Sequence, residues 1–138
     1  MHKEEKFSIT KTIKGNPAIS RLPFINLKNK VLGKNYNLGL VFIGDKLSKK
    51  LNKEYRNKDK KANILSFPLT KNEGEIFINI KETKRQSKVF GKSFDDFLKY
   101  LFIHGLLHLK GYEHSSKMES EEQKILRNLK SKNKELTQ

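Results

Sequence analysis

One segment of this chain, residues 93–111 with the sequence SFDDFLKYLFIHGLLHLKG, constrains the fold more than any other. Ser93, with Asp96 three residues later, resembles a capping box at a helix start, and Gly111 suits the left-handed position that ends a helix. Between them, Phe94–Lys110 is apolar over most of its length. Because such a helix must be covered by other elements, we predict that it is the long, central helix of the fold.

Short apolar or alternating stretches elsewhere predict strands. Pro68 falls within one of them, and since proline cannot donate to a sheet ladder, that strand is expected at a sheet edge or to end there. Asp45 follows another such stretch and is expected to be the N-cap of a helix on which Leu47, Leu51 and Tyr55 recur at every fourth position. The expected strands are residues 7–13, 36–43, 64–69 and 74–80.

The remaining segments predict further helices. Residues 14–35 suggest a short helix that is interrupted by Pro23, and residues 81–90 suggest a polar helix. Ser116, with Glu119 three residues later, is expected to start a last helix. We therefore expect an α+β fold of about four strands with helices packed on them, in a single domain over residues 1–138 with frayed ends.

The composition indicates the kind of partner. The net charge is +15, from 30 basic and 15 acidic residues, and such a surface attracts polyanions such as nucleic acid. Of the basic residues 26 are lysine and four are arginine, so plain compositional bias is the alternative explanation. The chain has no cysteine, which excludes disulfides and thiolate chemistry. Without an apolar leader or a membrane-length apolar run, the sequence favours a cytoplasmic location away from membranes.

Three of the four histidines lie within HGLLHLKGYEH, residues 104–114. His104 and His108 are four positions apart, so they share one face of the predicted helix, and the break at Gly111 lets the chain turn back and bring His114 to the same point. Three imidazoles with a fourth position open are the donor set of a catalytic zinc site. The alternative is that His104 and His108 are hydrogen-bonded core residues.

The same spacing is the ligand spacing of metzincin metalloproteases. Those enzymes carry a glutamate directly after the first histidine as the general base, but this chain has Gly105 there. A peptidase of that type would lack its base, so the residues favour another kind of metallohydrolase.

HGLLHLKGYEH resembles the signature of the YbeY family of bacterial endoribonucleases, H-G-x-L-H-L-x-G-Y-D-H, at ten of eleven positions, with Glu113 in place of the usual aspartate. LNKEYRNKDKKANILSFP (51–68) is similar to the family's L-N-x-x-Y-R and T-D-V-L-S-F-P segments, with Ala62 and Asn63 in place of Thr-Asp. GEIFIN resembles its G-D-I-x-I strand, with Glu75 for aspartate. The resemblance implies a mixed four-stranded sheet, one zinc-like ion, a role for Arg56, and work in ribosomal RNA maturation and ribosome quality control.

Several side chains besides the histidines are candidates for contact with RNA. Arg56 could hold a phosphate bidentately and stabilise the transition state, or it could be an ordinary surface arginine at a helix end. Lys61 and Ser66 could bind phosphate. The alternatives are that Lys61 belongs to a solvated loop and that the Ser66 hydroxyl forms a hydrogen bond with the backbone. Glu113 could orient an imidazole or be solvated. Since no stacking module of the RNP type is visible, RNA binding is expected to be electrostatic.

Taken with these features, the family resemblance implies a metal-dependent endoribonuclease that hydrolyses single-stranded ribosomal RNA, in 16S rRNA 3′-end maturation. The predicted ligands of one divalent ion, Zn²⁺ by preference, are His104, His108 and His114, with Arg56 catalytic and Arg56, Lys61 and Ser66 contacting substrate. The expected partners are the small ribosomal subunit and a ribosomal or GTPase protein, without a nucleotide cofactor. The alternatives are an RNA-binding ribosome-assembly factor whose metal cleaves little, or a metal-dependent hydrolase of another substrate, such as a peptide.

Overall fold

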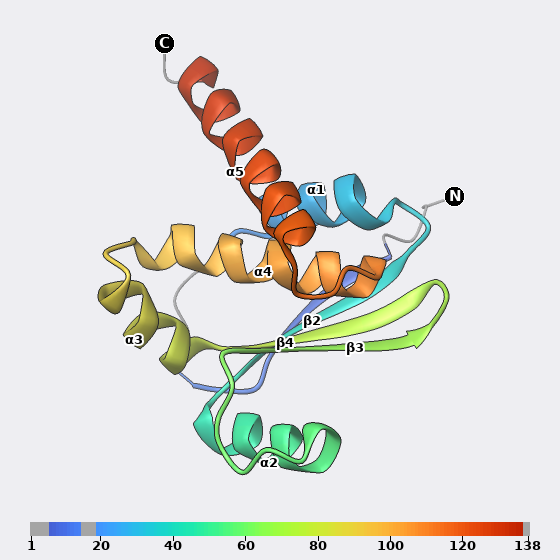
Figure 1. Cartoon of the computed structure of the whole chain (residues 1–138), viewed down its shortest axis with the longest axis vertical. Coiled ribbons are helices and arrows are strands. Elements are labelled where there is room, and N and C mark those ends of the chain that lie inside the picture. Colours follow the sequence, from blue (N-terminus) through green and yellow to red (C-terminus); the bar gives the residue numbers. More distant parts are fainter. Residues whose placement is uncertain (1–5, 15–18, 137–138) are drawn as a thin grey trace.

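A mixed sheet of four strands in the order β1-β2-β4-β3 carries the fold. The computed structural model describes residues 6–14 and 19–136, with side chains up to residue 129 (Figure 1). Neighbours β1, β2 and β4 are parallel, and β3 pairs with β4 antiparallel. The predicted α+β class with four strands is therefore confirmed. The strands are β1 (Phe7–Lys11), β2 (Asn37–Ile43), β3 (Ile64–Thr70) and β4 (Glu73–Asn79).

Five helices surround this sheet in the described part of the chain. Helix α4 lies along one face of the sheet together with α1, α2 lies against the opposite face, and α5 rises from α4 away from the sheet (Figure 1). The helices are α1 (Arg21–Leu32), α2 (Asp45–Arg56), α3 (Ile80–Val89), α4 (Phe94–Lys110) and α5 (Ser116–Leu136). No helix among the described residues is both long and apolar enough to cross a membrane.

The core lies between α4 and the two central strands. Leu40 on β2 is in register with Ile76 on β4, and Phe42 with Ile78, and all four side chains are fully buried. Phe102 of α4 packs into this layer and is also fully buried. Burial of such side chains stabilises the fold by about 1.5–3 kcal/mol each. The prediction that α4 is the central helix is confirmed.

Helix α4 approaches the sheet unusually closely at Gly105. A Cβ atom added there would lie 2.8 Å from Cδ1 of Ile64, 3.0 Å from Oγ of Ser66 and 3.1 Å from Cδ1 of Ile76. Glycine in a helix interior costs stability relative to alanine, so its presence here reflects the short separation of helix and strands. The glycine thus lets α4, the helix that carries His104 and His108, lie close to β3 and β4.

The predicted ends of α4 are also confirmed. The Ser93 hydroxyl accepts a hydrogen bond from the Asp96 amide at 3.1 Å, which satisfies one free N–H of the first turn. Gly111 has φ +110° and its N–H donates to the His108 carbonyl, so the helix ends in a left-handed residue. The length of the helix and the position of its turn therefore follow from local sequence.

Two local predictions were wrong. Gly44, not Asp45, is the N-cap of α2, because the Asp45 carboxylate bonds to side chains of β4 and α3 instead. Pro23 does not interrupt α1, since it lies in the first turn, where an N–H has no helical acceptor. In addition, β1 ends at Lys11, two residues earlier than expected. Ser116 is the first residue of α5, as predicted, and the Oγ of Ser115 caps this helix by accepting a hydrogen bond from the Met118 amide at 3.3 Å.

Candidate active site

The three histidines of residues 104–114 converge on one point. His104 and His108 lie one turn apart on α4, and the loop after Gly111 returns His114 to them. One ring nitrogen of each lies within 4.8 Å of the others, and the Nε2 atoms of His104 and His108 are 3.1 Å apart. Two tetrahedral ligands at the usual zinc–nitrogen distance would be about 3.3 Å apart. The cluster could therefore hold a metal ion.

The hydrogen bonds of two rings show which nitrogen faces the cluster. Nδ1 of His104 is 2.8 Å from Oε1 of Glu122, and Nδ1 of His108 is 3.1 Å from the carbonyl oxygen of Tyr112. A carboxylate and a carbonyl can only accept, so each Nδ1 carries a proton, and in the neutral form of each ring the lone pair is at Nε2. Two neutral rings with their Nε2 lone pairs 3.1 Å apart repel each other unless a metal ion lies between them or one ring takes up a proton. This arrangement fits a divalent metal.

The surroundings favour the neutral, metal-binding form of His108. Burial lowers its pKa below the ordinary histidine value, and the positive charges that His104 and His114 can carry lower it further. A hydrogen bond to the Tyr112 carbonyl and the charge of Glu122 oppose this only in part. His108 is therefore unprotonated at neutral pH, as a metal ligand must be.

Glu122 is the functional residue that the sequence analysis missed. It lies on α5, is 3% exposed, and orients His104 from behind, the arrangement of a carboxylate–histidine–metal triad. The candidate considered for this role, Glu113, is exposed in the loop, and no contact of its carboxylate with a histidine is among those found in the described residues. A signal was present, because Glu122 falls on the same helical face as buried Met118 and Ile125. An acid on an apolar face needs a buried partner.

Tyr100 lies on the other side of Glu122. Burial raises the pKa of its hydroxyl, and the charge of Glu122, which also accepts its hydrogen bond, raises that pKa further. Tyr100 therefore keeps its proton at neutral pH, and one buried carboxylate has two donors, an imidazole and a phenol.

A cavity of about 950 Å³ opens beside the histidines. Strand β3, helices α3 to α5 and the end of α2 all contribute to its wall. Both charged and aromatic side chains lie along it, so it can accept a ligand with polar and flat apolar parts. The lining residues are Arg56, Asn63, Ile64, Leu65, Ser66, Gln86, Phe90, Lys92, Phe97, Tyr100, Leu101, His104, His108, His114 and Gln123.

The structure separates the three predicted substrate contacts. Arg56, the last residue of α2, is exposed and lines the cavity. Ser66 also lines it, but its hydroxyl donates to the Gly105 carbonyl at 3.4 Å, the backbone bond considered as the alternative. Lys61 is not among the lining residues and is exposed, with its ammonium 3.9 Å from Oε2 of Glu82.

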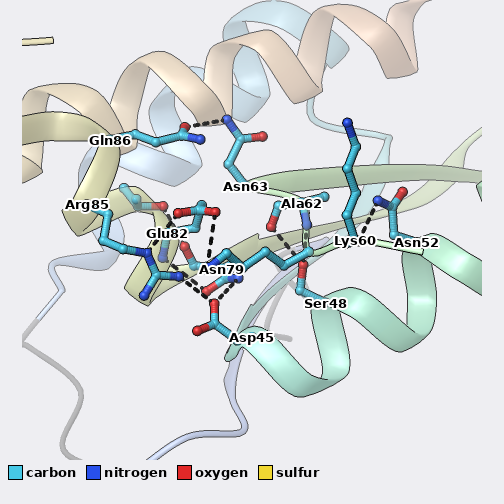
Figure 2. Close-up of polar contacts among 12 residues, drawn as sticks. Asp45, Ser48, Asn52, Lys60, Ala62, Asn63, Asn79, Glu82, Arg85 and Gln86 are labelled. Atoms are coloured by element: carbon cyan, nitrogen blue, oxygen red, sulfur yellow. Dashed lines mark hydrogen bonds and ion pairs between the residues drawn. The ribbon is translucent and has the colours of Figure 1, made fainter. Parts of the chain in front are cut away.

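The loop that links Arg56 to β3 is fixed by side chains of α2. The buried Ser48 hydroxyl donates to the Ala62 carbonyl at 2.7 Å and accepts from the Ala62 amide at 2.8 Å (Figure 2). The Asn52 amide donates to the Lys60 carbonyl at 2.8 Å. Residues 57–63 belong to no strand, so these side-chain bonds hold their backbone where a sheet would otherwise do so. Arg56 therefore lies at the start of an anchored loop.

A second group of contacts joins this loop and α2 to α3. Asp45 accepts hydrogen bonds from Asn79 at 2.9 Å and from Arg85 at 2.7 Å (Figure 2). Asn63 donates to Gln86 at 2.8 Å, and both residues line the cavity. Elements from three parts of the chain thereby hold one wall of the cavity in place.

Known proteins resemble this chain in both sequence and fold. The family model described as Endoribonuclease YbeY matches residues 3–135. Curated proteins of that name include one from Thermodesulfovibrio yellowstonii, 42% identical over 106 residues and covering 67% of each chain. A second, from Nautilia profundicola, is 40% identical over 67% of this chain and 72% of its own. A solution structure from Thermotoga maritima has the same fold, with a TM-score of 0.62 and 24% identity over 94% of this chain and 92% of its own.

Proposed function

Because this chain belongs to the Endoribonuclease YbeY family, we propose that it is a metal-dependent endoribonuclease that hydrolyses phosphodiester bonds in single-stranded ribosomal RNA. The observation that carries the metal-dependent part is the pair of Nε2 lone pairs, 3.1 Å apart, on His104 and His108. Their direction is set by acceptors behind both rings. We further propose that the enzyme acts in the cytoplasm, on the 3′ end of 16S rRNA and in ribosome quality control.

His104, His108 and His114 would hold one divalent ion, and their nitrogen-only donor set favours zinc. Such an ion supplies Lewis-acid activation of water and of a phosphoryl oxygen. The protein's part is to fix the rings: Glu122 and the Tyr112 carbonyl each hold one Nδ1, so that the opposite nitrogens point to the cluster.

Arg56 is proposed to bind the phosphate that is cleaved. Arg56 lines the same cavity as the histidines, and it lies at the start of the anchored loop. A guanidinium can hold two phosphate oxygens at once and neutralise charge that develops in the transition state. Arg56 would therefore contribute more to cleavage than to affinity, because the net charge of +15 supplies affinity from many residues.

A single strand fits the position of the site. His104 and His108 are half-buried at the wall of the cavity, so a phosphate must enter the cavity to reach them. An unpaired strand can place one phosphate there, whereas the two backbones of an RNA duplex are held apart by the helix. The small ribosomal subunit, with a ribosomal or GTPase protein, would present such a strand.

The peptidase alternative meets a steric obstacle at Gly105. A glutamate base at this position would begin with a Cβ atom 2.8 Å from Ile64 and 3.0 Å from Ser66. The helix would have to move away from the sheet to accept it. An assembly factor with a non-catalytic metal is the remaining alternative, and it differs in the outcome of a cleavage assay.

The test is cleavage of an end-labelled RNA with the sequence of a 16S rRNA 3′ end. Wild-type protein should cleave it, and His108→Ala, with circular dichroism to check the fold, should not. Arg56→Ala should bind the RNA about as tightly as wild type but cleave it at least tenfold more slowly. Arg127→Ala removes an exposed arginine of α5 that is not among the cavity residues, and it should cleave normally.

Equal cleavage by wild type and His108→Ala would show that the activity is not at the histidines. Binding without cleavage by wild type, also in the presence of small subunits, would favour the assembly factor. Normal cleavage by Arg56→Ala would remove Arg56 from the proposal.

A further inference from the structure

A row of aromatic rings leads along the cavity to the histidines. Phe90 stacks on Phe97 with ring centroids 5.6 Å apart and planes at 19°. Phe97 is followed by Tyr100 at 5.8 Å, and Tyr100 by His104 at 6.3 Å. All four residues line the cavity. The histidine cluster is therefore continuous with a row of aromatic rings whose outermost member is Phe90.

Phe90 is apolar and 63% exposed, whereas its neighbour in the row, Phe97, is buried. The turn between α3 and α4 holds it there. Its amide donates to the Gln86 carbonyl at 3.0 Å, and the Lys92 amide donates to the Ser87 carbonyl at 2.8 Å. The left-handed turn at Gly91, with φ +64°, lies between them. The ring is thus presented by a hydrogen-bonded turn and not by a loose loop.

A cation lies beside the aromatic row. The Lys92 ammonium is 5.4 Å from the centre of the Tyr100 ring and belongs to the cavity wall. The exposed Phe90 ring and the Lys92 cation line the same cavity, and they match the two parts of a nucleotide, because a base can stack on a ring and a phosphate can pair with the charge. The net charge of +15 complements a polyanionic strand and not an apolar peptide.

We propose that Phe90 is a base-stacking subsite for single-stranded RNA: an unpaired base a few nucleotides from the cleaved phosphate stacks on its ring, and Lys92 binds a phosphate beside it. This inference rests on the proposed function and adds how the strand is selected. A paired base offers no free face, so the subsite favours unpaired RNA. The sequence predicted that RNA binding is electrostatic. Stacking on Phe90 would be a second contribution to affinity, and it depends less on salt than phosphate contacts do.

Tryptophan fluorescence can test the stacking directly, because the chain contains no tryptophan. Phe90→Trp places a single indole in the proposed subsite. Val89→Trp places one at the adjacent residue, which is 80% exposed and is not among the cavity residues. A short oligouridylate should quench the first variant strongly and the second little, read at once after mixing. The same oligonucleotide with abasic sugars should quench neither.

Binding measurements then distinguish two roles of the Phe90 side chain, stacking on an RNA base and packing against Phe97. Phe90→Leu keeps an apolar side chain over Phe97 but removes the aromatic face. It should bind a labelled oligouridylate about tenfold more weakly than wild type, by fluorescence anisotropy, while Val89→Ala binds normally. For the abasic oligonucleotide, wild type and Phe90→Leu should be equal.

Two results would overturn the subsite while leaving the proposed function intact. They are equal quenching of the two tryptophan variants by an RNA that wild type binds and cleaves, and unchanged affinity of Phe90→Leu for that RNA. Failure of wild type to bind or cleave single-stranded RNA would instead refute the proposed function, and the subsite with it.

Discussion

Replacing Glu122 with glutamine should weaken metal binding while leaving the fold intact. Glu122 is 3% exposed and its Oε1 is 2.8 Å from Nδ1 of His104. The amide oxygen of glutamine can still accept the Nδ1 proton, so the ring keeps its orientation. What disappears is the negative charge behind the imidazole, which makes Nε2 a stronger donor to a metal. Glu122→Ala removes both the charge and the acceptor.

The expected size follows from losing one carboxylate that contacts one ligand. Such partners change metal affinity by about 10- to 100-fold, or about 1.4–2.8 kcal/mol. We expect Glu122→Gln near the lower value and Glu122→Ala near the upper. In metal-free protein the effect of Glu122→Gln should be neutral or stabilising, because a buried charge is costly to desolvate. Metal affinity should therefore fall without a loss of stability in the metal-free protein.

The assay is a zinc titration in competition with a chromophoric chelator, together with thermal unfolding with and without zinc. Zinc should raise the melting temperature of Glu122→Gln less than that of wild type. Glu113→Gln is the matched control, since Glu113 precedes a histidine of the cluster but is exposed. The reasoning is refuted if Glu122→Ala binds zinc as tightly as wild type, or if Glu113→Gln weakens binding more.

Three further changes test how the site is supported. Gly105→Ala should destabilise the protein by about 1 kcal/mol in urea unfolding, because overpacking against Ile64 outweighs the higher helix propensity of alanine. A more stable variant would contradict the close approach of α4 to β3. Ser48→Ala should lower the free energy of unfolding by about 1–3 kcal/mol in the same assay, since it leaves the N–H and the carbonyl of Ala62 without their hydrogen-bond partner. An unchanged urea midpoint would count against the anchored loop. Burial alone would raise the pKa of Asp45, but hydrogen bonds from Asn79 and Arg85 and the Arg85 charge lower it below the ordinary value. The contacts of the Asp45 carboxylate therefore stabilise the fold above the ordinary pKa, and this stabilisation is lost as the pH falls through the lowered pKa of the folded state. Asp45→Asn should reduce the melting temperature at pH 7 and reduce it much less at about pH 3. Equal losses at the two pH values would show that the charge of Asp45 does not stabilise the fold.

Features set by neighbouring residues were predictable from sequence. The ends of α4 follow from Ser93 and Gly111, whose hydrogen bonds are local. The approach of His114 to His104 needs only a helix period and one turn, so spacing was enough. The family resemblance added a mixed sheet, which no residue pattern specified.

Features that depend on packing between distant segments were not predictable in the same way. Glu122 reaches His104 only because α5 packs on α4, and from sequence the candidate for this role was Glu113, next to His114. Asp45 has the residue type of an N-cap, but its carboxylate is taken by Arg85, 40 positions away. Phe90 read as the end of a polar helix, and its stacking on Phe97 depends on the angle between α3 and α4. In each case a tertiary partner outweighs the local preference.

The sheet has a consequence for how copies of this protein behave in concentrated solution. Strand β3 is at one edge, and its free backbone groups could pair with a strand of another molecule. Pro68 offers no N–H there, and a register irregularity between Pro68 and Thr70 bends the end of the strand. With like-charged surfaces at a net charge of +15, strand addition at this edge is discouraged both by shape and by repulsion. Replacing Pro68 with a β-branched residue would remove the first barrier and leave the protein dependent on low salt to stay dispersed.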